Sequence, residues 1–187
     1  MRTLFLICSF FIATISAAQA ATVNVVPSSK TVNDLGNFSV LVSGTGFPET
    51  SGATLGLRFD PNVVNVTGMF LVTGSPFDYI SSSNFDNVTG EVQFISLLAP
   101  PVGALPSGNF NAFRIDFQSV AAGATSISLI DDGVSKGWTA ADFSLISGIT
   151  YNQANVVTGV PLPAASWLLL SGLGMLISTK RFAFRRR

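Results

Sequence analysis

The sequence predicts an all-β protein built around one β-sandwich of about eight or nine strands. Apolar and polar residues alternate along several short runs, such as residues 38–43 and 111–118, which places every second side chain on a core. Turn-forming clusters, including Asp60-Pro61-Asn62, separate these runs. No stretch between residues 21 and 159 has the period of an amphipathic helix, so two packed sheets are the expected architecture.

The predicted strands follow one another along the chain. They cover residues 23–26, 38–43, 54–59, 63–67, 69–73, 91–98, 111–118, 125–130 and 148–157. Residues 74–87 and 99–103 are predicted to be long loops, because turn-forming residues gather there. Residues 134–147 match neither pattern clearly, and residues 140–143 could form a single helical turn.

Residues 1–20 have the three parts of a secretory signal peptide, expected as an N-terminal helix. Arg2 supplies a positive charge, residues 4–15 are apolar, and Ala18-Gln19-Ala20 matches the small-x-small pattern of a cleavage site. The mature chain is therefore expected to begin at Ala21. The only cysteine, Cys8, lies in the apolar segment, so the mature protein is expected to have no disulfide.

Residues 160–187 predict a C-terminal membrane anchor. Pro161 and Pro163 hold the backbone extended. Residues 164–179 are uncharged and mostly apolar, and as a transmembrane helix they would span roughly 24 Å of the roughly 30 Å hydrocarbon core. The basic residues that follow predict a cytoplasmic end and an anchor in the inner membrane; they are Lys180, Arg181, Arg185, Arg186 and Arg187.

The order of these parts resembles a known sorting signal. The motif Val160-Pro161-Leu162-Pro163-Ala164-Ala165, an apolar span containing Ser171-Gly172-Leu173-Gly174, and an arginine-rich end are similar to the VPLPA variant of the PEP-CTERM signal. The resemblance implies a Gram-negative protein that the Sec machinery exports and an exosortase processes, with a final place on the cell surface or in an exopolysaccharide or biofilm matrix. The alternative is an ordinary anchor that is never processed.

The segment between the two terminal signals is acidic. Residues 21–159 contain four basic and ten acidic residues, a formal charge of −6, although the whole chain has a net charge of zero. A segment with this balance is a poor partner for nucleic acid or for anionic lipid. An exported body in the periplasm or outside the cell is therefore expected.

The residue types also argue against an enzyme. The chain has no histidine, and its mature part is expected to have no cysteine, which removes the commonest general base and the thiol nucleophile. Paired carboxylates could in principle hydrolyse glycosides, but none of the ten acidic residues lies in a recognisable catalytic motif. The sequence predicts no catalytic residues.

Calcium is the one cofactor that the sequence leaves open. Asp131 and Asp132 in a predicted loop, or Asp78 with Asp86, could supply the oxygen ligands that Ca²⁺ prefers. The alternative is an ordinary Asp-Gly turn whose carboxylates are solvated, and no EF-hand spacing is present.

Carbohydrate binding would need exposed aromatic side chains beside polar groups, and Tyr79, Trp138 and Tyr151 are the candidates. A ligand site is predicted most readily at Phe77 and Tyr79, which lie in a serine-rich segment with Asp78 and Asn84. The alternative is that these aromatic residues fill the core or anchor loops.

Residues 21–159 also resemble a known fold family. The segments Val26-Pro27-Ser28-Ser29, Leu57-Arg58-Phe59-Asp60-Pro61-Asn62-Val63-Val64, Gly90-Glu91-Val92-Gln93-Phe94 and Phe113-Arg114-Ile115-Asp116-Phe117 are similar to strands and turns of the cohesin and cellulose-binding type of jelly roll. That resemblance implies nine strands and relatives that bind dockerin modules or polysaccharide. The expected function is a structural or adhesive protein of the cell surface or matrix; the alternatives are a carbohydrate-binding module and a cohesin-like receptor for a surface protein.

Overall fold

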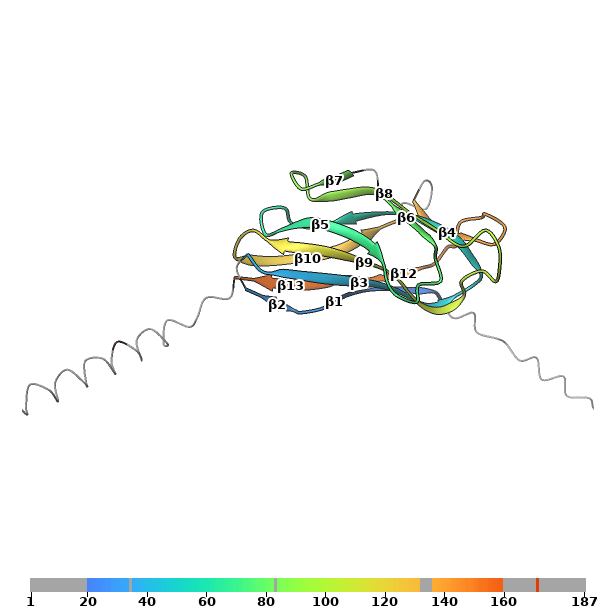
Figure 1. Ribbon diagram of the computed structural model, residues 1–187, viewed down its shortest axis with the longest axis horizontal. Coiled ribbons are helices and arrows are strands. Elements are labelled where there is room, and N and C mark those ends of the chain that lie inside the picture. The colour runs from blue at the N-terminus through green and yellow to red at the C-terminus, as the bar shows by residue number, and fades with distance from the viewer. Residues whose placement is uncertain (1–19, 34, 83, 132–135, 160–170, 172–187) are drawn as a thin grey trace, which may run out of the picture.

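The structure is a computed structural model that describes residues 20–33, 35–82, 84–131, 136–159 and 171. Two β-sheets lie face to face and enclose one apolar core, which confirms the predicted all-β sandwich (Figure 1). Alternating burial along the long strands, such as β3 (Asn37–Phe47), explains the arrangement, because one side chain in two points into the core.

The first sheet has five strands in the order β12-β1-β3-β9-β5. The parallel pair β1–β12 is its exception, since the other neighbours are antiparallel. The strands besides β3 are β12 (Thr150–Asn152), β1 (Thr22–Pro27), β9 (Gly108–Ser119) and β5 (Val64–Leu71).

The second sheet has the order β2-β13-β10-β4-β8-β6, with β11 paired to β4 and β7 paired to β8. Its longest strand, β4, pairs antiparallel with β10 on one side and with β8 on the other. The bounds are β2 (Thr31–Val32), β13 (Ala154–Thr158), β10 (Gly123–Ile130), β4 (Thr50–Arg58), β8 (Glu91–Leu98), β6 (Tyr79–Ser81), β11 (Gly137–Ala140) and β7 (Asn84–Asp86).

Several predicted elements differ from the structure, in which the described residues form thirteen strands. The predicted strands 63–67 and 69–73 are one strand, β5, because a bulge at Thr67 interrupts the alternation without ending the pairing. The predicted strand 148–157 is two strands, since β12 joins the first sheet and β13 the second. The predicted loop 74–87 contains β6 and β7.

The ambiguous segment 134–147 contains β11, and residues 132–135 lie outside the described residues. The single helical turn that residues 140–143 could form is wrong. The chain makes a tight turn there, in which the Phe143 amide donates to the Ala140 carbonyl at 3.0 Å and the Ala140 amide donates to the Ser144 carbonyl at 2.8 Å.

Two aromatic clusters fill the core near opposite ends of β3. Phe38 stacks on Phe117 with ring centroids 5.3 Å apart, and Phe59 meets Phe117 edge-on at 5.8 Å. At the other end Phe47 lies 4.8 Å from Trp138 and 5.1 Å from Phe110. These rings supply large apolar area, so the fold is held by packing between the two sheets.

The described chain enters and leaves the sandwich at opposite ends (Figure 1). The Ala21 carbonyl accepts a hydrogen bond from the Thr150 amide at 3.0 Å, whereas the Gly159 amide donates to the Val32 carbonyl at 2.9 Å. A tether attached after Gly159 would therefore leave the end that holds Ala21 facing away from it.

The outer edge of the first sheet, β5, is capped at Val66 by a side chain. The Asn87 carboxamide accepts a hydrogen bond from the Val66 amide at 2.8 Å and donates to the Val66 carbonyl at 3.1 Å. The carboxamide thus takes the place of a neighbouring strand, which protects this edge against pairing with another chain.

The terminal predictions fall largely on residues outside the described part. The predicted signal helix and Ala18 fall within residues 1–19, which lie outside it. The sorting motif, the predicted membrane span and the basic tail fall within residues 160–170 and 172–187, which also lie outside it. Within the described residues no helix is long and apolar enough to cross a membrane. Ala20 is exposed and Ala21 is buried.

Candidate functional site

The outward surface of β4, β8 and their neighbours in the second sheet combines charged and apolar side chains. Paired residues of neighbouring strands point to the same side of a sheet, so the pairs Arg58–Glu91 and Tyr79–Leu98 fall on one surface. We call this surface the β4–β8 face and define it by Arg58, Tyr79, Glu91, Phe94, Leu98, Ile130 and Lys136.

An ion pair forms one end of the β4–β8 face. The Arg58 guanidinium donates to Glu91 Oε1 from Nη2 at 2.7 Å and from Nε at 3.1 Å. The Gln93 side-chain carboxamide donates to Glu91 Oε2 from Nε2 at 3.3 Å. The hydrogen bonds from Arg58, and then the one from Gln93, hold the pKa of the Glu91 carboxyl below its usual range. The face therefore presents both charges in fixed positions near neutral pH.

Apolar side chains form the rest of the β4–β8 face. Phe94, Tyr79 and Leu98 are between 47% and 52% exposed. Lys136 Nζ lies 5.5 Å from the centre of the Phe94 ring, within the range of a cation–π contact. Three half-exposed apolar side chains beside charged groups have the composition of a protein-binding surface.

A β-bulge aims Phe94 outward. Leu55 pairs with Ile95 and Leu57 with Val92, so Gln93 and Phe94 together lie opposite Gly56. Phe94 has φ of 52°, in the left-handed region that a phenylalanine rarely adopts. Strained backbone of this kind gathers at binding sites, where the surrounding structure maintains it.

Glycines occupy part of the β4–β8 face on β4. Gly52 and Gly56 take two of the outward positions on β4, and neither carries a side chain. The Ile130 and Lys136 side chains lean over Gly56, since their nearest carbons lie 3.3 and 3.7 Å from the place of a Cβ there. Both glycines are buried, so this part of the face is formed by side chains of neighbouring segments.

The structure separates the residues that the sequence predicted for ligand binding. Tyr79 and Asp78 are exposed, as is Asn84, and Tyr79 belongs to the β4–β8 face. Phe77 is buried in the core. The prediction that Trp138 is an exposed ligand platform is wrong: its side chain is fully buried, because β11 pairs with β4 and turns the indole inward against Phe47 and Phe110.

Tyr151 is half-buried and anchors a loop end, as the alternative interpretation expected of the aromatic residues. Its hydroxyl donates to Asp131 Oδ2 at 2.6 Å. Burial, followed by the Asp131 carboxylate, raises the pKa of the Tyr151 hydroxyl well above its usual value. The Trp138 indole N–H lies near this hydroxyl without reaching hydrogen-bonding geometry. The hydrogen bond between Tyr151 and Asp131 joins β12 to the end of β10.

The structure does not bring the predicted calcium ligands Asp78 and Asp86 together. Asp78 is next to Tyr79, which pairs with Leu98 at one end of β8, whereas Asp86 pairs with Glu91 at the other end. At about 3.3 Å per residue along β8, the two carboxylates lie roughly 20 Å apart and cannot share an ion. Asp86 Oδ1 instead accepts hydrogen bonds from the Val88 and Thr89 amides. Asp131 bonds Tyr151, and Asp132 lies outside the described residues. Among the described residues no three His, Cys, Asp or Glu side chains gather as metal ligands.

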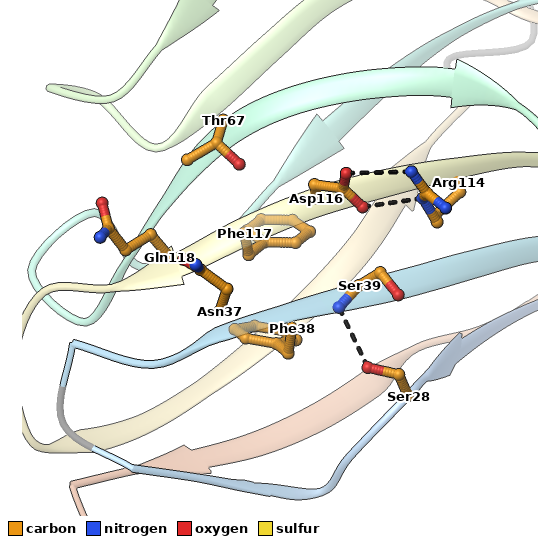
Figure 2. A pocket seen from close by; sticks show the side chains of 9 residues that line it. All are labelled: Ser28, Asn37, Phe38, Ser39, Thr67, Arg114, Asp116, Phe117 and Gln118. Carbon is orange, nitrogen blue, oxygen red and sulfur yellow. Dashed lines mark hydrogen bonds and ion pairs between the residues drawn. The ribbon is translucent and has the colours of Figure 1, made fainter.

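The outward surface of the first sheet carries an open hollow of about 660 Å³, which we call the polar hollow (Figure 2). Arg114 and Asp116 on β9 line it as a bidentate ion pair, with N–O distances of 2.9 and 3.2 Å. Its lining is Ser28, Asn37, Phe38, Ser39, Thr67, Arg114, Asp116, Phe117 and Gln118. None of these residues was predicted to bind a ligand, because their types are ordinary for a solvated strand face.

Comparison with known proteins identifies the fold. No protein-family model matches the chain, and no curated protein sequence matches it. Solved structures of cohesins do match. A type II cohesin domain from the cellulosome of Acetivibrio cellulolyticus superposes with a TM-score of 0.59 at 13% identity, over 79% of this chain and 99% of the cohesin.

Two further cohesins show the same likeness. The third cohesin of ScaC from Acetivibrio cellulolyticus, solved in complex with the ScaB dockerin, has a TM-score of 0.57 at 16% identity, over 74% of this chain and 98% of that one. A non-cellulosomal cohesin from the archaeon Archaeoglobus fulgidus has a TM-score of 0.55 at 15% identity, over 75% and 91%. The predicted resemblance of the sandwich to the cohesin fold is confirmed.

Proposed function

We propose that this chain is an exported, non-enzymatic docking module that binds a partner protein through the β4–β8 face. The observation that carries the proposal is the face itself, where Tyr79, Phe94 and Leu98 stand half-exposed on the surface whose other end carries the Arg58–Glu91 ion pair. Aromatic anchors beside fixed charges are typical of protein interfaces. The cohesin-like fold agrees with this function, since one of its similar structures is a cohesin in complex with a dockerin.

The charges on the face favour a protein over a polysaccharide as the partner at this site. Arg58, Glu91 and Lys136 place both signs within one surface, so complementary charges on a partner would set its orientation. A partner bound there would cover Phe94 and Leu98 together.

The test uses the full chain, immobilised from mild detergent, and surface and secreted fractions of its own host. We expect the wild type to retain a partner protein. The Phe94→Ala and Leu98→Asp variants should bind that partner about tenfold more weakly or worse, and so fail to retain it. The matched control is Phe70→Ala, which removes a half-exposed phenylalanine from the first sheet and should leave retention unchanged. Equal retention by all variants, or no retention by the wild type, would contradict the proposal.

The proposal extends to delivery and attachment. An exosortase would recognise the segment from Val160 to Ala165. Before processing, residues 164–179 and the basic tail would hold the chain in the inner membrane. The processed product would act on the cell surface or in the matrix. The exit of the chain at the Gly159 end supports this order, because a tether there leaves both outward sheet surfaces accessible.

The intact mass of the protein from its own host tests the processing step. A chain that begins at Ala21 and ends within residues 161–165, with or without an added group, is the expected result. A chain that still contains Trp167 to Arg187 and occurs in the membrane fraction alone would contradict exosortase processing and leave an anchored docking module.

A further inference from the structure

The outward surface of the first sheet differs in chemistry from the β4–β8 face. Three adjacent rows cross β3, β9 and β5 there: Leu41, Arg114 and Phe70; then Ser39, Asp116 and Gly68; then Asn37, Gln118 and Asn65. One row is apolar and cationic, the next carries a carboxylate, and the third carries three carboxamides. The polar hollow covers the last two rows on β3 and β9.

An exposed ring is held beside these rows. The Phe70 side chain is 51% exposed, and the Arg114 guanidinium carbon lies 5.5 Å from the ring centre. Ring atoms Cε2 and Cζ lie 2.7 and 3.0 Å from the place that a Cβ on Gly68 would take. The ring therefore leans along β5 over the glycine, toward the row of Asp116, and any side chain at residue 68 would displace it.

The polar groups of the hollow suit a ligand that both donates and accepts hydrogen bonds. Asp116 and Arg114, the charged residues that line the hollow, neutralise each other, so the lining carries no net charge. The side chains of Asn37, Thr67 and Gln118 make no hydrogen bond to any described residue, and each of them can donate and accept. An anionic ligand would need donors alone, whereas hydroxyl groups use both kinds of partner.

We propose that this surface binds a neutral oligosaccharide, with Phe70 against the apolar face of a sugar ring and Asp116, Gln118 and Asn37 bonded to its hydroxyl groups. The volume of about 660 Å³ lies within the roughly 300–1,000 Å³ usual for ligand sites. The hollow is open along the sheet, so inner residues of a long polysaccharide can occupy it as well as chain ends. The site lies on the opposite side of the sandwich from the β4–β8 face and is independent of protein docking there.

The test is calorimetric titration of the full chain in mild detergent with neutral hexasaccharides of glucose, mannose and galactose, and with a galacturonate hexamer as the anionic comparison. At least one neutral hexamer is expected to bind, and more tightly than the galacturonate. Phe70→Ala is expected to weaken binding about tenfold, the equivalent of one aromatic contact, and Gln118→Ala severalfold.

Gly68→Ala is the sharpest variant, because it displaces the Phe70 ring without removing any group that would touch the sugar; a loss similar to that of Phe70→Ala is expected. The matched control is Phe94→Ala, which removes the phenylalanine that packs near Lys136 on the other surface. Unfolding midpoints of the four variants verify that each is folded. Absence of binding by every neutral hexamer, preference for galacturonate, or binding that Phe94→Ala abolishes and Phe70→Ala leaves intact would overturn the proposal.

Discussion

Replacement of Trp138 by alanine is expected to lower the free energy of unfolding by about 3–5 kcal/mol. The indole is fully buried and lies between the rings of Phe47, Phe77 and Phe110, at centroid distances of 4.8, 6.1 and 5.8 Å. Its removal would leave a cavity that the flanking rings cannot fill from strands fixed in two sheets. Urea unfolding followed by circular dichroism measures the change.

Phe143→Ala is the control for Trp138→Ala. Phe143 is 80% exposed in the turn after β11, so its loss should change the free energy of unfolding by less than about 0.5 kcal/mol. A Trp138→Ala variant as stable as Phe143→Ala would show that the indole is not part of the core and would reopen its assignment as a ligand platform.

Gly90→Ala is expected to lower the free energy of unfolding by about 3 kcal/mol or more. Gly90 has φ of 75°, and a Cβ at this position would collide with the Phe59 carbonyl oxygen and lie 2.6 Å from Pro61 Cδ. The Gly90 carbonyl also accepts a hydrogen bond from the Phe59 amide at 2.9 Å. The turn before β8 and the turn after β4 are thus packed on each other with no room for a side chain.

Gly74→Ala separates the cost of the positive φ from the cost of the collision between the Cβ and its neighbours. Gly74 has φ of 79°, close to that of Gly90, but no atom lies within 4 Å of the place of its Cβ. The cost there should be the backbone penalty alone, about 1 kcal/mol. Equal losses for the two variants, measured by the same urea unfolding, would mean that the contact between the turns contributes nothing.

The fold could be predicted where alternation was uninterrupted. Alternation is regular along β10, which was predicted over 125–130 and spans 123–130 in the structure, and its inward residues Thr125, Ile127 and Leu129 are buried. The errors fall at places where the backbone departs from a regular strand while the chain stays paired. The bulge at Thr67 made one strand look like two, and the passage of the chain from the first sheet to the second near Gln153 left no mark in the residue types.

The candidate surfaces were harder to predict than the fold. Gln93-Phe94 between the inward residues Val92 and Ile95 does break the alternation, and that break was the available sign of an outward-facing phenylalanine. Phe70 gave no such sign, since its position depends on Gly68 and on Arg114 from a strand more than forty residues away. Trp138 was misassigned because its burial comes from β4, which is distant in sequence.

The most direct test of docking through the β4–β8 face is hydroxyl-radical footprinting of the full chain, free and bound to the protein that it retains. In the free chain Tyr79, Phe94 and Phe70 should all be oxidised, because each is about half exposed. In the complex the oxidation of Tyr79 and Phe94 is expected to fall severalfold while that of Phe70 stays unchanged. Protection of Phe70 with continued oxidation of Phe94 would place the partner on the first sheet and contradict the account.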